Sequence, residues 1–128
     1  MLKMLEYGTA FAVGAVIYTF LEIAFRGYTH WTMTLTGGFC LVIIYLINDV
    51  FAYAPMPVKC LMGALIITVT EFIVGCIVNL GFHQNVWDYS GLRFNIMGQV
   101  CLYFTIIWYF LSIPAFYICS VISKMFEV

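Results

Sequence analysis

The chain has 128 residues, of which 65% are hydrophobic and 9% are charged, and its formal net charge is −1. A water-soluble domain needs charged side chains over its surface, and 5 Lys and Arg with 6 Asp and Glu are too few for this length. The composition therefore indicates an integral membrane protein. Its length allows about four helical spans of roughly 20 residues each.

Four apolar runs, bounded by polar or helix-breaking residues, predict four membrane-spanning helices at 7–26, 31–53, 58–80 and 94–122. We expect the first run to be a retained span rather than a cleaved signal peptide, because it continues past Phe25 and carries Glu22. The runs are continuous rather than alternating, which excludes a transmembrane β-barrel. The predicted fold is an all-α polytopic bundle forming a single transmembrane domain over residues 1–128.

Parts of the sequence recur along the chain. Residues 14–22 read GAVIYTFLE and residues 63–71 read GALIITVTE, so Gly, Ala, Ile, Thr and Glu repeat in register. Further on, GGFCL at 37–41 matches GQVCL at 98–102 in its Gly, Cys and Leu. These matches predict a duplicated helical hairpin. The alternative is that membrane sequences resemble one another by composition alone.

The duplication gives a first hairpin of about 7–53 and a second of about 58–122, both facing the same way across the membrane. Both hairpin bends then lie on one face, and the termini lie on the other with the turn at 54–57. Three lysines on the terminal side, against two arginines at the bends, favour cytoplasmic termini.

Polar residues are concentrated at the two bends and predict a ligand-binding cup there. Glu22 and Arg26 have the i, i+4 spacing of a helical ion pair, which is also the alternative, purely structural reading. Glu71 is predicted to lie about 13 Å deep in the membrane, where a carboxylate faces the interior of the bundle. Its alternative role is a protonated side chain bonded to a neighbouring helix. The candidate binding residues are Glu22, Arg26, His30, Glu71, Asn79, Trp87, Asp88, Tyr89, Arg93, Asn95 and Gln99.

The segment 81–92 is predicted to be an ordered lid over this cup. In this interpretation Asp88 forms a latch with Arg26 or Arg93, whereas the alternative is that Asp88 only stabilises the loop. We expect Asn95 and Gln99 to lie i, i+4 on one face at the start of the last span. The aromatic residues Trp87 and Tyr89 also fit an ordinary interfacial belt.

Neither a metal nor a cofactor is predicted. The two histidines lack the spacing and the accompanying ligands of a metal site. The five cysteines lie in apolar runs without paired spacing, which is typical of buried thiols. We expect Gly37–Gly38 and Gly75 to allow close packing of helices. No basic run suggests nucleic acid.

Three stretches resemble a known family: LEIAFRGYTHWTMTLTGG at 21–38, ALIITVTEFIVG at 64–75 and VWDYSGLRFNIMGQVCL at 86–102. They are similar to the ABC-transporter-type (CmpB-like) family of small multi-span membrane proteins. Arg93 departs from the family pattern, in which a proline often precedes Phe-Asn. The resemblance implies a bacterial membrane protein related to transport, although the chain has no Walker A motif and so could supply at most a membrane subunit.

Three classes of function remain open. A cup for a small solute, in a transport or binding module, is favoured. The alternatives are an intramembrane enzyme acting on a lipid or amphiphile, and a structural or holin-like membrane protein. Beyond membrane lipid, the expected partner is a second copy of the chain, since four spans enclose little volume. A homodimer is favoured, joined through the small-residue faces at Gly14–Ala15 and Gly63–Ala64.

Overall fold

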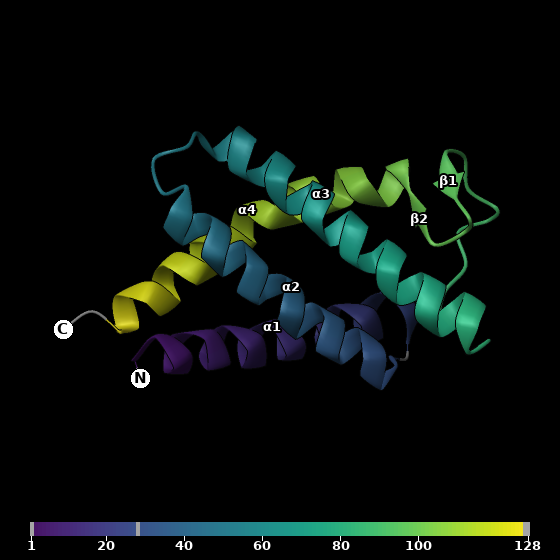
Figure 1. Ribbon diagram of the computed structural model, residues 1–128, viewed down its shortest axis with the longest axis horizontal. Helices are drawn as coiled ribbons and strands as arrows, with labels where there is room; N and C mark the ends of the chain where they lie inside the picture. Colours follow the sequence, from purple (N-terminus) through teal and green to yellow (C-terminus); the bar gives the residue numbers. More distant parts are fainter. Residues whose placement is uncertain (1, 28, 127–128) are drawn as a thin grey trace.

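The computed structural model describes residues 2–27 and 29–126. The described part of the chain forms four long helices, and a short two-stranded hairpin precedes the last of them (Figure 1). All four helices are long and apolar enough to cross a membrane, which confirms the predicted four-span, all-α fold. The elements are α1 (Leu2–Arg26), α2 (Trp31–Val50), α3 (Met56–Gly75), the π-helix η1 (Cys76–Gly81), β1 (Asn95–Ile96), β2 (Val100–Cys101) and α4 (Leu102–Met125).

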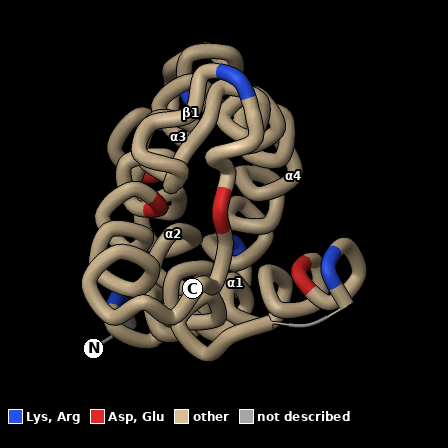
Figure 2. Tube along the Cα trace, turned by 90° about the vertical axis from the view of Figure 1, so that its right-hand side faces the viewer, with Lys and Arg blue, Asp and Glu red and all other residues tan. Residues whose placement is uncertain are grey.

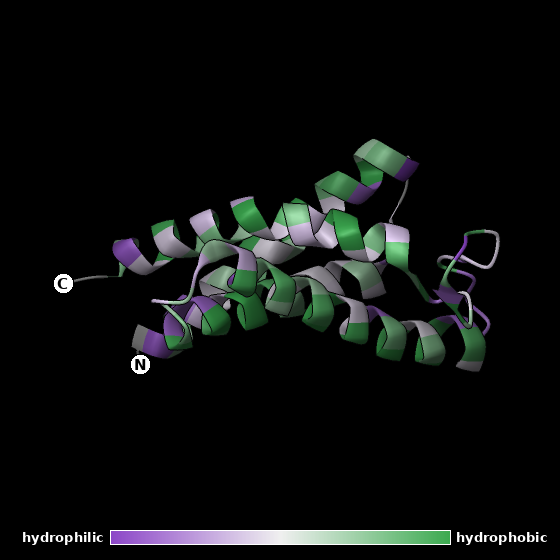
Figure 3. Cartoon of the chain, turned by 90° about the horizontal axis from the view of Figure 1, so that it is seen from above, coloured by the Kyte–Doolittle hydropathy of each residue, from purple (hydrophilic) through white to green (hydrophobic). Residues whose placement is uncertain are grey.

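The two ends of the bundle differ in what they carry. The termini lie at one end with the connection between α2 and α3, and the other end holds the α1–α2 connection and residues 82–101 (Figure 1). We call the second of these the bend end. Both predicted hairpin bends are therefore on the same side. Seen from the bend end, charged positions are sparse along the chain (Figure 2). Seen from above, the strongly hydrophilic residues are concentrated toward the two ends of the bundle (Figure 3).

Helices α1 and α2 pack with their backbones close together, because glycines stand at the crossing. A Cβ added to Gly14 would lie 2.5 Å from Leu41 Cβ and 2.7 Å from the Gly37 carbonyl oxygen. Gly38 meets the backbone of Phe11 in the same way, at 2.8 Å. The expected role of Gly37–Gly38 in close helix packing is thus confirmed.

The small-residue faces that we expected between two copies are used inside one chain. Gly14 packs against α2, and a Cβ on Gly63 would lie 2.8 Å from Ser112 Oγ of α4. Ala64 is 1% exposed. Gly14, Gly63 and Ala64 are thus covered by the chain's own helices, whereas Ala15 is half-buried. Contact between two copies stays a prediction.

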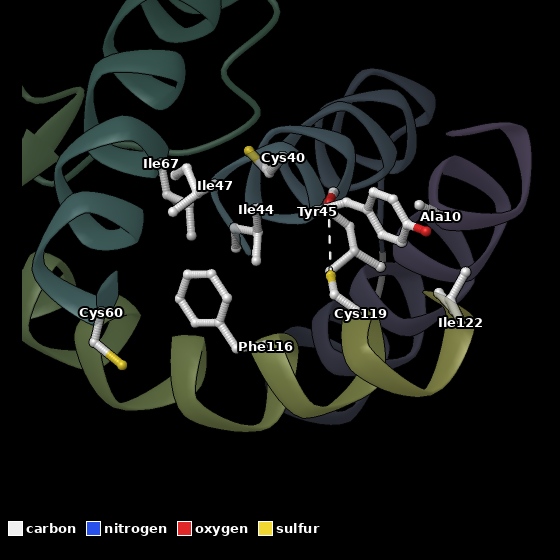
Figure 4. Packing of buried hydrophobic residues seen from close by; sticks show 11 residues of the cluster. Ala10, Cys40, Ile44, Tyr45, Ile47, Cys60, Ile67, Phe116, Cys119 and Ile122 are labelled. Carbon is white, nitrogen blue, oxygen red and sulfur yellow. Dashed lines mark hydrogen bonds between the residues drawn. The ribbon is translucent and has the colours of Figure 1, made fainter. Parts of the chain in front are cut away.

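The hydrophobic core lies between α2, α3 and α4, and Ala10 of α1 joins it (Figure 4). Phe116 at its centre is 1% exposed, and aliphatic residues of α2 and α3 surround it. Four of the cysteines are buried, in agreement with the prediction, and Cys76 is half-buried. Pro114 lies inside α4, which changes direction along its length (Figure 1).

The start of the last span differs from the prediction. Residues 94–101 form a hairpin in which Asn95 pairs with Cys101 and Ile96 with Val100, and the helix begins only at Leu102. Asn95 explains the difference, because its side chain donates to the Leu92 carbonyl at 2.7 Å and accepts from the Gly98 amide at 3.0 Å. Such side-chain bonds to the backbone compete with helix formation. Asn95 and Gln99 therefore do not share a helical face.

This hairpin also affects the comparison of the two predicted repeats. Glu22 and Glu71 are both buried, at 8% and 2% exposure, on helices that run in the same direction (Figure 1). Gly37 lies within α2, whereas Gly98 has φ +74 in the turn between β1 and β2. Glu22 and Glu71 are thus both buried on helices of the same direction, whereas Gly37 and Gly98 lie in different kinds of backbone. The duplication itself stays a prediction.

Candidate functional site

A cavity of about 640 Å³ lies at the bend end, between α1, α4 and residues 85–89. We call it the bend-end cavity. Its volume is within the usual range for small-molecule sites. From α1 it is lined by Tyr18, Leu21, Glu22, Phe25 and Arg26, and from α4 by Tyr103, Phe104, Ile107, Trp108 and Leu111. The connection between η1 and β1, which we call the polar loop, contributes the remaining wall, from Asn85 to Tyr89.

Arg26 connects the loop to the first span. Its guanidinium donates to the Val86 carbonyl oxygen, 60 residues away in sequence, and pairs with the Glu22 carboxylate at 3.4 Å. The predicted Glu22–Arg26 pair is therefore present. Because Arg26 also holds the loop, the pair is part of the attachment that forms the cavity wall.

A second attachment joins the loop to η1 and to the hairpin. Asn79 Oδ1 accepts from the Val86 amide at 2.7 Å, and Asn79 Nδ2 donates to Gln99 Oε1 at 2.8 Å. Trp87 Nε1 donates to the Gln99 carbonyl oxygen at 2.8 Å. These three side chains are at most 7% exposed, so their bonds are shielded from water.

The network changes the role predicted for Asn79 and Gln99. The structure brings them together with Trp87, as expected, but their amide groups bind each other and the loop backbone. Neither lines the bend-end cavity. They position the loop, whereas Trp87 both takes part in the network and lines the cavity.

Gly75 makes this close packing possible. A Cβ at this position would lie 2.6 Å from Gln99 Oε1 and 3.0 Å from the Trp87 ring. Any larger residue would push the hairpin and the loop away from α3. Gly75 therefore allows close packing, as predicted, although its partners are the hairpin and the loop.

Asp88 does not form the predicted latch. It is exposed, and its Oδ1 accepts from the Ser90 amide at 2.9 Å, which is the turn-stabilising role we had kept as the alternative. This hydrogen bond holds the pKa of Asp88 below its ordinary value. The loop is nevertheless ordered and folded back, since Val86 and Trp87 are 5% and 7% exposed. Its latch is the Val86 carbonyl rather than a carboxylate.

Aromatic rings cover much of the cavity wall in two stacked pairs. Tyr18 of α1 stacks on Trp108 of α4 with ring centroids 5.9 Å apart, and Tyr89 of the loop stacks on Phe104 at 4.7 Å. Tyr103 meets Phe104 edge-on at 5.3 Å. Burial raises the pKa of the Tyr89 hydroxyl well above its ordinary value, so it stays protonated.

Glu71 lies behind this wall and is 2% exposed. Tyr18 and Trp108, which line the cavity, are both near its carboxyl group. Within the described residues, Glu71 Oε1 and Trp108 Nε1 are buried without a hydrogen-bond partner. Such groups are rare in folded proteins and indicate a place where a polar ligand or water completes the bonding.

Three predicted site residues lie elsewhere. His30 accepts from the Thr32 amide at 3.3 Å as the N-cap of α2, and its ring stacks on Trp31. Arg93 is exposed, and Asn95 closes the hairpin. In contrast, Tyr18 and Trp108 were missed. The i, i+4 spacing of Phe104 and Trp108 could have indicated an aromatic face, but aromatic residues within apolar spans also face lipid.

Residues 9–127 match the family described as "Putative ABC-transporter type IV". The chain belongs to this family. The match covers nearly the whole chain, and together with the four apolar helices it supports a membrane protein of the transporter type. No curated protein and no solved structure matches the chain significantly.

Proposed function

We propose that this protein binds a small solute in the bend-end cavity as the membrane-embedded part of a transport system. The observation that carries the proposal is the cavity itself, about 640 Å³, with the Glu22 and Asp88 carboxylates and the Arg26 guanidinium set among aromatic rings. A cavity that is mostly apolar, with a few convergent polar groups, is the usual form of a small-molecule site. Its place at one end of the bundle would open it to one face of the membrane.

Membership of a transporter-type family supports this proposal over an intramembrane enzyme. Ser90, the serine of the segment 81–92, is exposed and donates its backbone amide to Asp88. The cysteines are mostly buried in the helical bundle. Glu22, the carboxylate that lines the cavity from α1, is already paired with Arg26.

We further propose that the protein is multi-pass in a bacterial cell membrane, with cytoplasmic termini, and assembles as a homodimer or larger. The lysine bias supports the orientation. The exposed apolar faces of the helices, such as Phe20 and Val16 of α1 at 69% and 55% exposure, are available to lipid or to a second copy. Mass measurement of the protein in detergent tests the assembly, and protein mass equal to one 14.6 kDa chain would contradict it.

The solute site is tested by filling the cavity from α4. Ile107 lines the cavity, whereas its neighbour Ile106 is 50% exposed on another face of the same helix. We expect Ile107→Trp to abolish solute binding and uptake into proteoliposomes, and Ile106→Trp to leave both unchanged. Equal activity of the two variants, with both correctly folded, would contradict a solute site in this cavity.

A further inference from the structure

The charges around the bend-end cavity favour one class of solute. Glu22 and Asp88 line it, and Glu71 lies behind its aromatic wall. Among the described lining residues, Arg26 is the one cation, and it already binds Glu22 and the Val86 carbonyl. An anion entering here would meet carboxylates from α1 and from the loop. A cation would meet them as partners.

The aromatic wall favours the same class. Faces of Tyr, Trp and Phe attract cations through their quadrupoles. Here the Tyr18–Trp108 and Tyr89–Phe104 pairs bring such rings from three segments of the chain to one cavity. Their apolar area also suits a hydrocarbon body, which a small inorganic cation lacks.

The buried, unsatisfied oxygen of Glu71 is an independent observation. Its carboxyl group is next to Tyr18 and Trp108, and Oε1 has no hydrogen-bond partner in the described part of the chain. A positive ligand against these rings would place a counter-charge near a carboxyl group that otherwise has none. An anionic solute would instead bring a second negative charge close to this buried carboxyl group.

We propose, building on the proposed function, that the solute is an organic cation: an ammonium group attached to an apolar body. The ammonium group lies against the aromatic faces with Glu22 as its anionic neighbour. The apolar body occupies the part of the cavity lined by Leu21, Ile107 and Leu111.

The test measures binding of benzyltrimethylammonium, benzyl alcohol and benzenesulfonate to the full chain in lipid nanodiscs, with empty nanodiscs subtracted. These probes share a ring and differ in charge. We expect the cation to bind at least tenfold more tightly than the anion. Benzenesulfonate that binds as tightly as benzyltrimethylammonium, or more tightly, would overturn the cation class. If Ile107→Trp abolishes that binding, the solute site itself is retained. Absence of binding by all three probes would count against the proposed function itself.

Variants separate a ring contact from a structural role. We expect Tyr89→Leu to weaken cation binding about 3- to 30-fold, the usual range for a cation–π contact, and Tyr89→Phe to restore it to within about twofold. Phe110→Leu, on an outward face of α4 with 61% exposure, is the matched control. We expect Glu22→Gln to weaken binding of benzyltrimethylammonium about tenfold or more and to leave the binding of benzyl alcohol unchanged. Equal loss of the cation and the alcohol in these variants would overturn the proposal.

Discussion

The guanidinium of Arg26, at the end of α1, donates to the carbonyl oxygen of Val86 in the middle of the polar loop. This bond fixes the loop to a span far from it in sequence. We therefore expect Arg26→Ala to release residues 84–90 and to leave the four helices in place. Hydrogen exchange of the Trp87 and Val86 amides should rise by at least tenfold, since loss of a charge-assisted bond costs about 1.5–3 kcal/mol.

Arg93→Ala is the control for this prediction. It removes the same charge from the bend end, but Arg93 is exposed and lies after the loop in sequence. In this variant, hydrogen exchange of the Val86 and Trp87 amides should match that of the unaltered protein. If both variants loosened the loop equally, net charge rather than the Arg26–Val86 bond would be the cause.

A second prediction concerns Gly75. In most helices Gly→Ala stabilises by roughly 0.5–1 kcal/mol. At Gly75 the added methyl group would lie 2.6 Å from Gln99 Oε1, so we expect destabilisation of about 1–3 kcal/mol instead. Gly8→Ala, where nothing lies within 4 Å of the new Cβ, should be neutral or stabilising. Thermal unfolding in detergent measures both, and a Gly75→Ala variant at least as stable as the unaltered protein would show that Gly75 is not packed as described.

A third prediction concerns the buried amide network. Asn79→Leu would leave the Val86 amide and Gln99 Oε1 without their partners, at a cost of about 1–3 kcal/mol for each buried group that stays unsatisfied. The exposed neighbour Gln84→Leu should change the free energy of unfolding by less than about 0.5 kcal/mol. The fluorescence of Trp87, which is bonded to Gln99, should shift to the red only in the first variant.

The fourth prediction is a pH dependence of the loop. The Ser90 amide bond lowers the pKa of Asp88 below its ordinary value of 3.8, because it favours the ionised form in the folded protein. The stabilisation from this bond is therefore fully present above that value and is lost as pH falls through the lower, folded pKa. Carbon NMR of the Asp88 carboxyl should give a midpoint below 3.8, and an ordinary or raised midpoint would contradict the turn geometry.

Asp88→Asn provides the matching variant. The side-chain oxygen of Asn can still accept from Ser90, so we expect the loop to stay closed at neutral pH. The acid transition of the loop should disappear. If the loop opened at neutral pH in this variant, the Asp88 carboxylate would be the latch, in place of the Arg26–Val86 bond.

The spans could be predicted because bilayer thickness sets both the length and the apolar content of a helix. Glu22, Arg26 and Trp87, which line the bend-end cavity, could be named from the sequence for a related reason, since polar and interfacial residues stand out among apolar spans. The hairpin at 94–101 could not be predicted in this way. Its residues read as apolar, and the bonds of Asn95 to its neighbouring backbone decide its conformation. Burial of Tyr18 and Trp108 depends on how α1 and α4 meet, which hydropathy alone does not encode.

The π-helical end of the third span affects how relatives of this protein should be compared. In η1 the Phe82 amide bonds to the Ile77 carbonyl, five residues earlier, so the chain is wound more loosely there than in α3. Each residue of an α-helix turns the chain by about 100°. A relative with one residue fewer between Gly75 and Asn79 would have a regular α-helix here. The regular helix would keep its counterpart of Asn79, which anchors the loop, on the same side. Alignments should therefore place such a gap within 76–81, because a gap in the polar loop would assign the anchor to the wrong residue.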